Sequence, residues 1–102
     1  MMISAKFYAK GNQIVSYEFS GHALYDVIGQ DIVCAAVSSL YVTITNELSH
    51  YICDEIDTDK VTLMMIDDKT DALTQALHNG CKAIQETYPE HVDVMLCQIK
   101  RS

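Results

Sequence analysis

The sequence predicts an α+β fold, a two-layer sandwich of order β-β-α-β-α-β in which a four-stranded sheet carries two helices on one face. Two segments near the N-terminus alternate apolar and polar residues, which is the period of a half-buried strand. Two later segments place apolar residues three and four positions apart, which is the period of an amphipathic helix. The chain has 102 residues, enough for one hydrophobic core, so we expect a single domain over residues 1–102.

The first two strands are expected at residues 3–9 and 14–20. Between them lie Gly11 and Asn12, and both residues tolerate positive φ, so the two strands should form a β-hairpin. The apolar positions of the alternation, which should share one face, are Ile3, Ala5, Phe7, Val15, Tyr17 and Phe19.

The first helix is expected from Ile32 to about Tyr51, a stretch without glycine or proline. Asp31 stands where an N-cap belongs, because its carboxylate can accept hydrogen bonds from the free backbone N–H groups of the first turn. This start places Cys34 within the first turn. The apolar positions that define the helix are Val33, Val37, Leu40, Tyr41, Ile44, Leu48 and Tyr51.

The acidic segment from Cys53 to Lys60 is expected to be a loop, and Val61–Ile66 a third strand. Thr70 is expected to cap a second helix, which continues until Tyr88 and Pro89 stop it.

His91–Ile99 is expected to form the last strand, with Val92, Val94 and Leu96 facing the helices. The opposite sheet face would then be apolar, which would suit a dimer contact or form only a sheltered patch. Its expected apolar residues are Met95, Cys97 and Ile99, with Met64 or Met65 as neighbours.

Charge and composition narrow the class of function. The formal net charge of −7 disfavours nucleic acid as a partner and favours a basic protein or peptide. No apolar run approaches the roughly 20 residues that cross a bilayer, and the N-terminus carries lysines where a signal peptide is apolar, so a cytoplasmic protein without membrane contact is expected. The four cysteines form no CxxC pair and the histidines no metal-binding motif, so reduced thiols and no metal or cofactor are expected.

His22 and Cys34 are the candidate catalytic pair. The free N–H groups and the dipole of a helix N-terminus favour a thiolate, and they can also stabilise an oxyanion on an attacked carbonyl. His22 could act as the base if Gly21 and Gly29 let the intervening loop close. The alternative interpretation is that Cys34 is a small buried residue and His22 a surface residue.

The segment "GHALYDVIGQDIVCAAVS", residues 21–38, resembles the ribosomal-processing cysteine protease family Prp, whose signature is Gly-His-Ala, a spacer, and Gly-x-Asp-Ile-Val-Cys-Ala-Ala/Gly-x-Ser. Chain length and element order resemble the family as well. The resemblance implies that Cys34 is the nucleophile, His22 the general base and Asp31 a supporting residue, with Gly21 and Ser38 as further signature positions. Ser38, one turn beyond Cys34, could orient the thiol or bond back to the preceding turn of the helix.

The resemblance also implies a homodimer that removes a short N-terminal extension from large-subunit ribosomal protein twenty-seven. The spacer after His22 is bulkier and more apolar than is common in the family, which would suit an extension with aromatic residues before the cut. Asp31 could act as a helix cap or orient the imidazole of His22 as the third member of a triad. A competing hypothesis is a non-enzymatic ribosome-assembly partner whose acidic surface binds a basic ribosomal protein.

Overall fold

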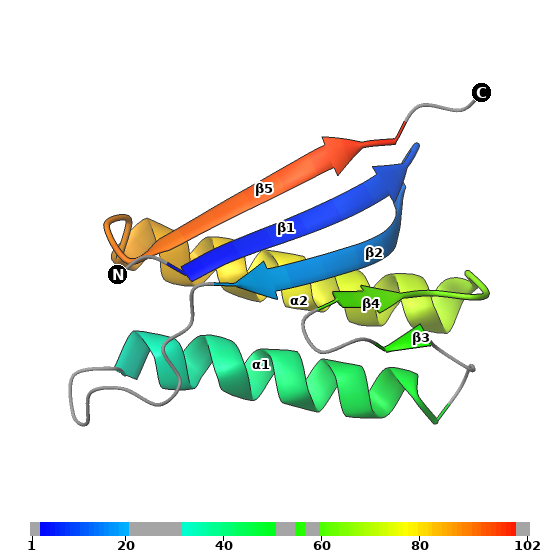
Figure 1. The fold of residues 1–102 in the computed structure, drawn as a ribbon, viewed down its shortest axis with the longest axis horizontal. Coiled ribbons are helices and arrows are strands. Elements are labelled where there is room, and N and C mark those ends of the chain that lie inside the picture. Colours follow the sequence, from blue (N-terminus) through cyan, green and yellow to red (C-terminus); the bar gives the residue numbers. More distant parts are fainter. Residues whose placement is uncertain (1–2, 21–31, 51–54, 57–59, 100–102) are drawn as a thin grey trace.

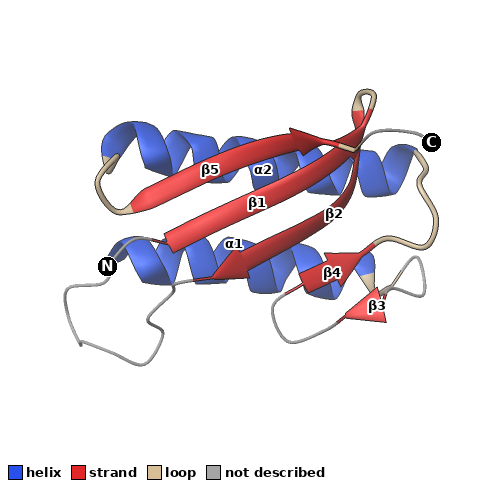
Figure 2. Ribbon diagram, turned by 45° about the horizontal axis from the view of Figure 1, so that its top comes forward, coloured by secondary structure: helices blue, strands red, loops and turns tan. Residues whose placement is uncertain are grey.

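The computed structural model describes residues 3–20, 32–50, 55–56 and 60–99. Its strands form one sheet in the order β3-β4-β2-β1-β5, and both helices lie on the same face of that sheet (Figure 1 and Figure 2). The elements are β1 (Ile3–Lys10), β2 (Gln13–Ser20), α1 (Ile32–Leu48), β3 (Glu55–Ile56), β4 (Lys60–Thr62), α2 (Asp68–Thr87) and β5 (Val92–Gln98). The predicted α+β fold with its four main strands and two helices is confirmed.

The structure adds the two-residue strand β3, which lies in the segment that was expected to be a loop. This strand pairs antiparallel with β4 and forms one edge of the sheet. β5 forms the other edge and runs parallel to β1, because α2 carries the chain across the sheet before β5 begins.

The hairpin of β1 and β2 contains a β-bulge. Tyr8 pairs with Ser16 and the next residue, Ala9, pairs with Ile14, so Val15 is the extra residue on β2. A bulge reverses the alternation of side chains beyond it. Ile14, only 2% exposed, therefore occupies the core position that the simple alternation assigned to Val15. The expected turn is confirmed by Gly11, whose φ is 64°.

α1 begins at Ile32 as expected and ends at Leu48, three residues before the expected end at Tyr51, which lies outside the described residues. The last turn tightens because the N–H of His50 bonds to the carbonyl of Glu47, only three residues back. On the buried side of the helix, Thr45 Oγ1 lies 2.7 Å from the hydroxyl of Tyr17 on β2, which satisfies both buried polar groups.

α2 begins three residues earlier than expected, and the prediction that Thr70 caps it was wrong. Asp67 is the cap: its Oδ1 accepts from the backbone N–H of Thr70, at 3.0 Å. In return Thr70 Oγ1 accepts from the backbone N–H of Asp67, at 2.9 Å. This reciprocal capping box satisfies two backbone donors at once, which Thr70 acting alone could not do. The helix ends at Thr87, before Pro89, as expected.

The two helices touch each other at a glycine. A Cβ atom on Gly80 of α2 would lie 2.9 Å from Leu40 Cδ1 of α1, so the missing side chain permits the close approach. Leu77 and Cys81, on either side of Gly80, are fully buried. Helix packing therefore fixes α1 from one side while the sheet fixes it from the other.

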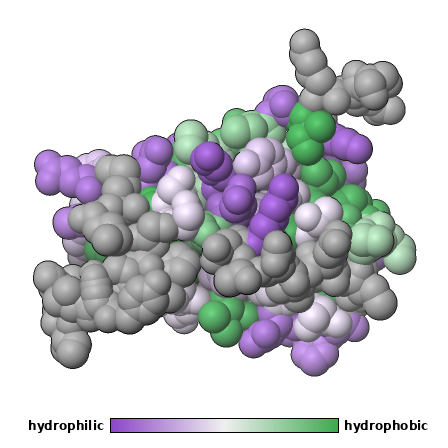
Figure 3. Space-filling view, viewed as in Figure 1, coloured by the Kyte–Doolittle hydropathy of each residue, from purple (hydrophilic) through white to green (hydrophobic). Residues whose placement is uncertain are grey.

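The sheet face opposite the helices is polar at its centre, so the expectation of an apolar second face was wrong. The strand register places Lys6 beside Glu18, and Glu18 beside Lys60. Figure 3 shows hydrophilic side chains gathered over the middle of this face. Met95 and Cys97 do lie there and are half-buried, but Met64 and Met65 follow the end of β4, which is shorter than predicted.

Leu96 faces the side of the helices as predicted, yet it is 51% exposed because β5 is an edge strand. Its cross-strand partner on β1 is Phe7, which is fully buried. The core therefore ends between these two residues.

Replacing Asp67 tests the capping box. Asp67→Ala removes the carboxylate that accepts from Thr70 and should lower the free energy of unfolding by about 0.5–2 kcal/mol, measured by urea denaturation. Asp68→Ala is the matched control, because Asp68 lies in the same turn but does not cap. Equal losses in the two variants would contradict the capping role.

Candidate active site

Cys34 is the third residue of α1, so its predicted place in the first turn of the helix is confirmed. The residue is only 6% exposed and belongs to the same core cluster as Val33 and Val37. Backbone N–H groups of a helix's first turn have no partner inside the helix and point out of it at its N-terminus. The thiol thus combines burial with a cluster of backbone donors beside it.

The exposed surface of α1 next to Cys34 carries no charge. Ile32 is 66% exposed, and Ala35, Ala36 and Ser39 are exposed as well. Glu47 is the first charged residue of the helix and lies near its far end. In a chain in which 21% of the residues are charged, this surface is suited to contact with an apolar or uncharged stretch of peptide.

Ser38 lies one helical turn beyond Cys34 and is half-buried. Side chains four residues apart in a helix are neighbours on one face. The structure therefore places Ser38 on the Cys34 side of α1, as the sequence predicted.

His22, Gly21 and Asp31 lie outside the described residues. The segment that contains them begins after Ser20, at the end of β2, and ends at Ile32, the first residue of α1. Figure 1 shows that the end of β2 and the start of α1 lie toward the same end of the molecule.

The other described cysteines differ from Cys34. Cys81, on α2, is completely buried, and this burial raises the pKa of its thiol from 9.0 to about 12, so it stays protonated and is a poor nucleophile. Cys97 lies on β5, beside Tyr8 on the polar sheet face. Cys53 lies outside the described residues. Of the three cysteines within the described residues, Cys34 is the one in the first turn of a helix.

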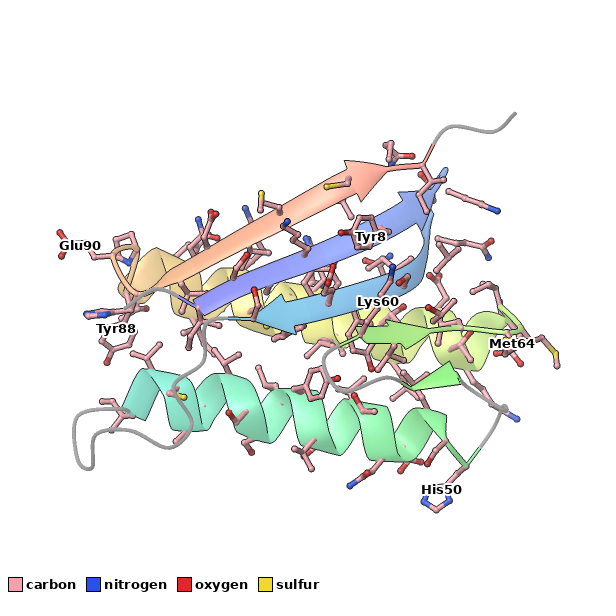
Figure 4. The ribbon with its side chains drawn as sticks, in the orientation of Figure 1. Tyr8, His50, Lys60, Met64, Tyr88 and Glu90 are labelled. Atoms are coloured by element: carbon pink, nitrogen blue, oxygen red, sulfur yellow. The ribbon has the colours of Figure 1, made fainter. Side chains whose placement is uncertain are left out.

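A polar cluster on the sheet face away from the helices was not identified from the sequence. The Tyr8 hydroxyl donates to Glu18 Oε1 at 3.2 Å, and the Lys60 ammonium lies 5.3 Å from the centre of the Tyr8 ring (Figure 4). Partial burial, and then Glu18, raise the pKa of Tyr8. The strand alternation places Tyr8 and Glu18 on one face, but only the register brings Lys60 beside them. Cys34 packs on the opposite face of the sheet, so this cluster is separate from it.

The described residues show neither a metal site nor a membrane-spanning helix. Across the described parts of the chain, no group of three or more His, Cys, Asp or Glu side chains is arranged to hold a metal ion. Neither described helix combines the length and apolar character needed to span a membrane.

Comparison with protein families identifies the class of protein. The family model for cysteine protease Prp matches residues 2–93. The chain belongs to the cysteine protease Prp family. The predicted enzyme class, a cysteine protease, is thereby confirmed, and membership favours it over a non-enzymatic assembly partner. Comparison with curated protein sequences finds no match.

Solved structures share the fold. A crystal structure of a Streptococcus mutans protein is 31% identical, with a TM-score of 0.81, and the alignment covers 96% of each chain. The essential ribosomal processing protease Prp of Staphylococcus aureus, in complex with a covalently linked product peptide, is 20% identical, with a TM-score of 0.74. The same protease with a substrate peptide is 19% identical, with a TM-score of 0.75. Both alignments cover 93% of this chain and 99% of the other.

Proposed function

We propose that this chain is a ribosomal processing endopeptidase that removes the N-terminal extension of large-subunit ribosomal protein twenty-seven. Cys34 is the nucleophile and His22 the general base. The observation that carries the proposal is the place of Cys34 in the first turn of α1, in a chain that belongs to a cysteine protease family.

The reaction proceeds by acyl transfer. His22 takes the proton of the Cys34 thiol, and the thiolate sulfur attacks the scissile carbonyl carbon. Backbone N–H groups of the first turn of α1 donate to the oxyanion that forms. The carbon–nitrogen bond breaks as His22 gives its proton to the leaving amine, which leaves a thioester on Cys34. His22 then takes a proton from a water, whose oxygen attacks the thioester carbonyl. The carbon–sulfur bond breaks, the peptide acid leaves, and His22 returns the proton to the Cys34 thiolate.

Charge and surface composition support this class of substrate. The chain carries a net charge of −7, which attracts a basic ribosomal protein. The uncharged surface at Ile32, Ala35 and Ala36 suits an apolar extension. The related Staphylococcus aureus protein, crystallised with a substrate peptide, is a ribosomal processing protease.

Burial of Cys34 sets a requirement on this mechanism. Cys34 is only 6% exposed, so little of its surface is open to a peptide. We therefore expect substrate binding to increase the exposure of the thiol.

We also propose that the chain acts as one domain, as a homodimer and in the cytoplasm. The dimer rests on the family resemblance alone, because the sheet face that was expected to support it is polar at its centre. Light scattering at micromolar concentration should give about twice the chain mass of 11.4 kDa. A single-chain mass at every concentration would exclude the dimer.

Replacing the nucleophile tests the proposed function. Cys34→Ser should abolish cleavage of a peptide that spans the extension, because neither the helix dipole nor one histidine converts a serine hydroxyl to an alkoxide. The melting temperature should change little, since the two side chains have similar size. Cleavage is followed by mass spectrometry, with Cys97→Ser as the matched thiol control. If Cys97→Ser loses activity equally, or if Cys34→Ser retains it, the assignment is wrong.

Replacing Asp31 separates its two possible roles, and we favour the helix cap. Asp31→Ala should then lower the free energy of unfolding by about 0.5–2 kcal/mol, whereas Asp31→Asn should be mild because asparagine caps nearly as well. Both variants are compared by melting temperature and by turnover. An Asn variant that melts normally but has lost turnover by orders of magnitude would instead show that the carboxylate orients His22.

A further inference from the structure

Four aromatic rings join the sheet to α1: Phe7 on β1, Tyr17 and Phe19 on β2, and Tyr41 on α1. Phe19 and Tyr41 form the closest ring pair of the described residues, with centroids 4.9 Å apart and an interplanar angle of 62°. Phe19 is 3% exposed, so this contact is inside the core. Edge-to-face packing of this kind holds two elements in a defined relative position.

One ring of this pair lies on the strand that leads to His22, and the other lies on the helix that carries Cys34. Phe19 is the second-last residue of β2 and precedes His22 by three residues in the sequence. Tyr41 follows Cys34 by two helical turns and therefore lies on the same side of α1, about 10 Å further along the axis. The ring contact thus joins the element that leads to His22 with the element that carries Cys34.

We propose that Phe19 and Tyr41 are positioning residues for the His22–Cys34 pair, an inference that rests on the proposed function. The ring pair holds the end of β2 against α1. It therefore fixes the position of the last residue of β2, after which the chain continues toward His22, relative to the Cys34 thiol. When one ring is removed, the end of β2 can shift against α1. Small displacements of a base relative to its nucleophile lower the rate of the catalysed reaction.

A second attachment between the same two elements provides a control. Thr45 and Tyr17 meet 2.7 Å apart, one helical turn further from Cys34 than Tyr41 is. Thr45→Val keeps the shape of the side chain and removes its hydroxyl from this contact. It weakens the attachment of α1 to β2 without removing a ring from the Phe19–Tyr41 pair.

The experiment compares Phe19→Leu, Tyr41→Leu, the double variant and Thr45→Val, with melting temperatures recorded for all. With the extension peptide, Phe19→Leu and Tyr41→Leu should each lower kcat about tenfold or more at nearly unchanged KM. The kcat loss of the double variant should be smaller than the product of the two single losses, because the Phe19–Tyr41 contact is absent from all three variants, while each single variant also loses the contact of its own ring with Tyr17. Thr45→Val should lower the melting temperature and keep kcat.

A second readout does not depend on cleavage. The rate at which iodoacetamide alkylates Cys34 is measured against pH, and the ring variants should need a higher pH than the parent chain and Thr45→Val, because the imidazole no longer assists thiolate formation. Unchanged kcat and alkylation profiles in a folded Phe19→Leu or Tyr41→Leu variant would overturn the proposal. So would equal kcat losses in Thr45→Val, which would make the role merely structural. A parent chain that does not cleave the peptide would refute the proposed function instead, while the alkylation profiles would still test the positioning.

Discussion

The packing of aromatic side chains between the sheet and α1 is the constraint on which the rest of the structure depends. Phe7 and Tyr17 are completely buried, and each such ring contributes roughly 1.5–3 kcal/mol by leaving water. The Tyr17 hydroxyl is hydrogen-bonded to Thr45, so its burial in the cluster costs little free energy. Because these rings come from β1, β2 and α1, they determine where the helix lies on the sheet.

This packing is also the basis of the role proposed for Cys34. Once α1 is held on the sheet with its start toward the end of β2, the backbone donors of its first turn lie beside Cys34. Cys81 belongs to the same core but sits in the middle of α2, where burial raises the pKa of its thiol. Both thiols are buried, and they differ in their position along a helix.

Much of the fold could be predicted from the sequence because its periodic patterns are strong. The alternation in β1 and the 3–4 spacing in both helices gave the correct elements, and the Asp-Ile-Val-Cys segment gave the first-turn position of Cys34. The errors have local physical causes. Alternation cannot reveal a bulge, so Val15 was placed where Ile14 lies. Asp67 and Thr70 are both good capping residues, and only the paired hydrogen bonds decide between them.

The sequence was less informative about which surfaces are apolar and about how deeply Cys34 is buried. Whether Met95 and Cys97 belong to an apolar face depends on the strands beside them, and the register instead brings Lys6, Glu18 and Lys60 to the centre. The 6% exposure of Cys34 likewise follows from tertiary packing, because a first-turn position on a helix is compatible with either a buried or an open thiol. The Phe19–Tyr41 contact joins residues 22 positions apart, which no local pattern predicts.

The central claim is that the first turn of α1 makes Cys34 the one nucleophile of this chain, and covalent capture tests it most directly. The protein is treated with an extension peptide that ends in a chloromethyl ketone, and the modified cysteine is located by tandem mass spectrometry. The account predicts a single adduct per chain on Cys34, formed much more slowly in His22→Ala. An adduct on Cys53, Cys81 or Cys97, or equal labelling of several thiols, would contradict it.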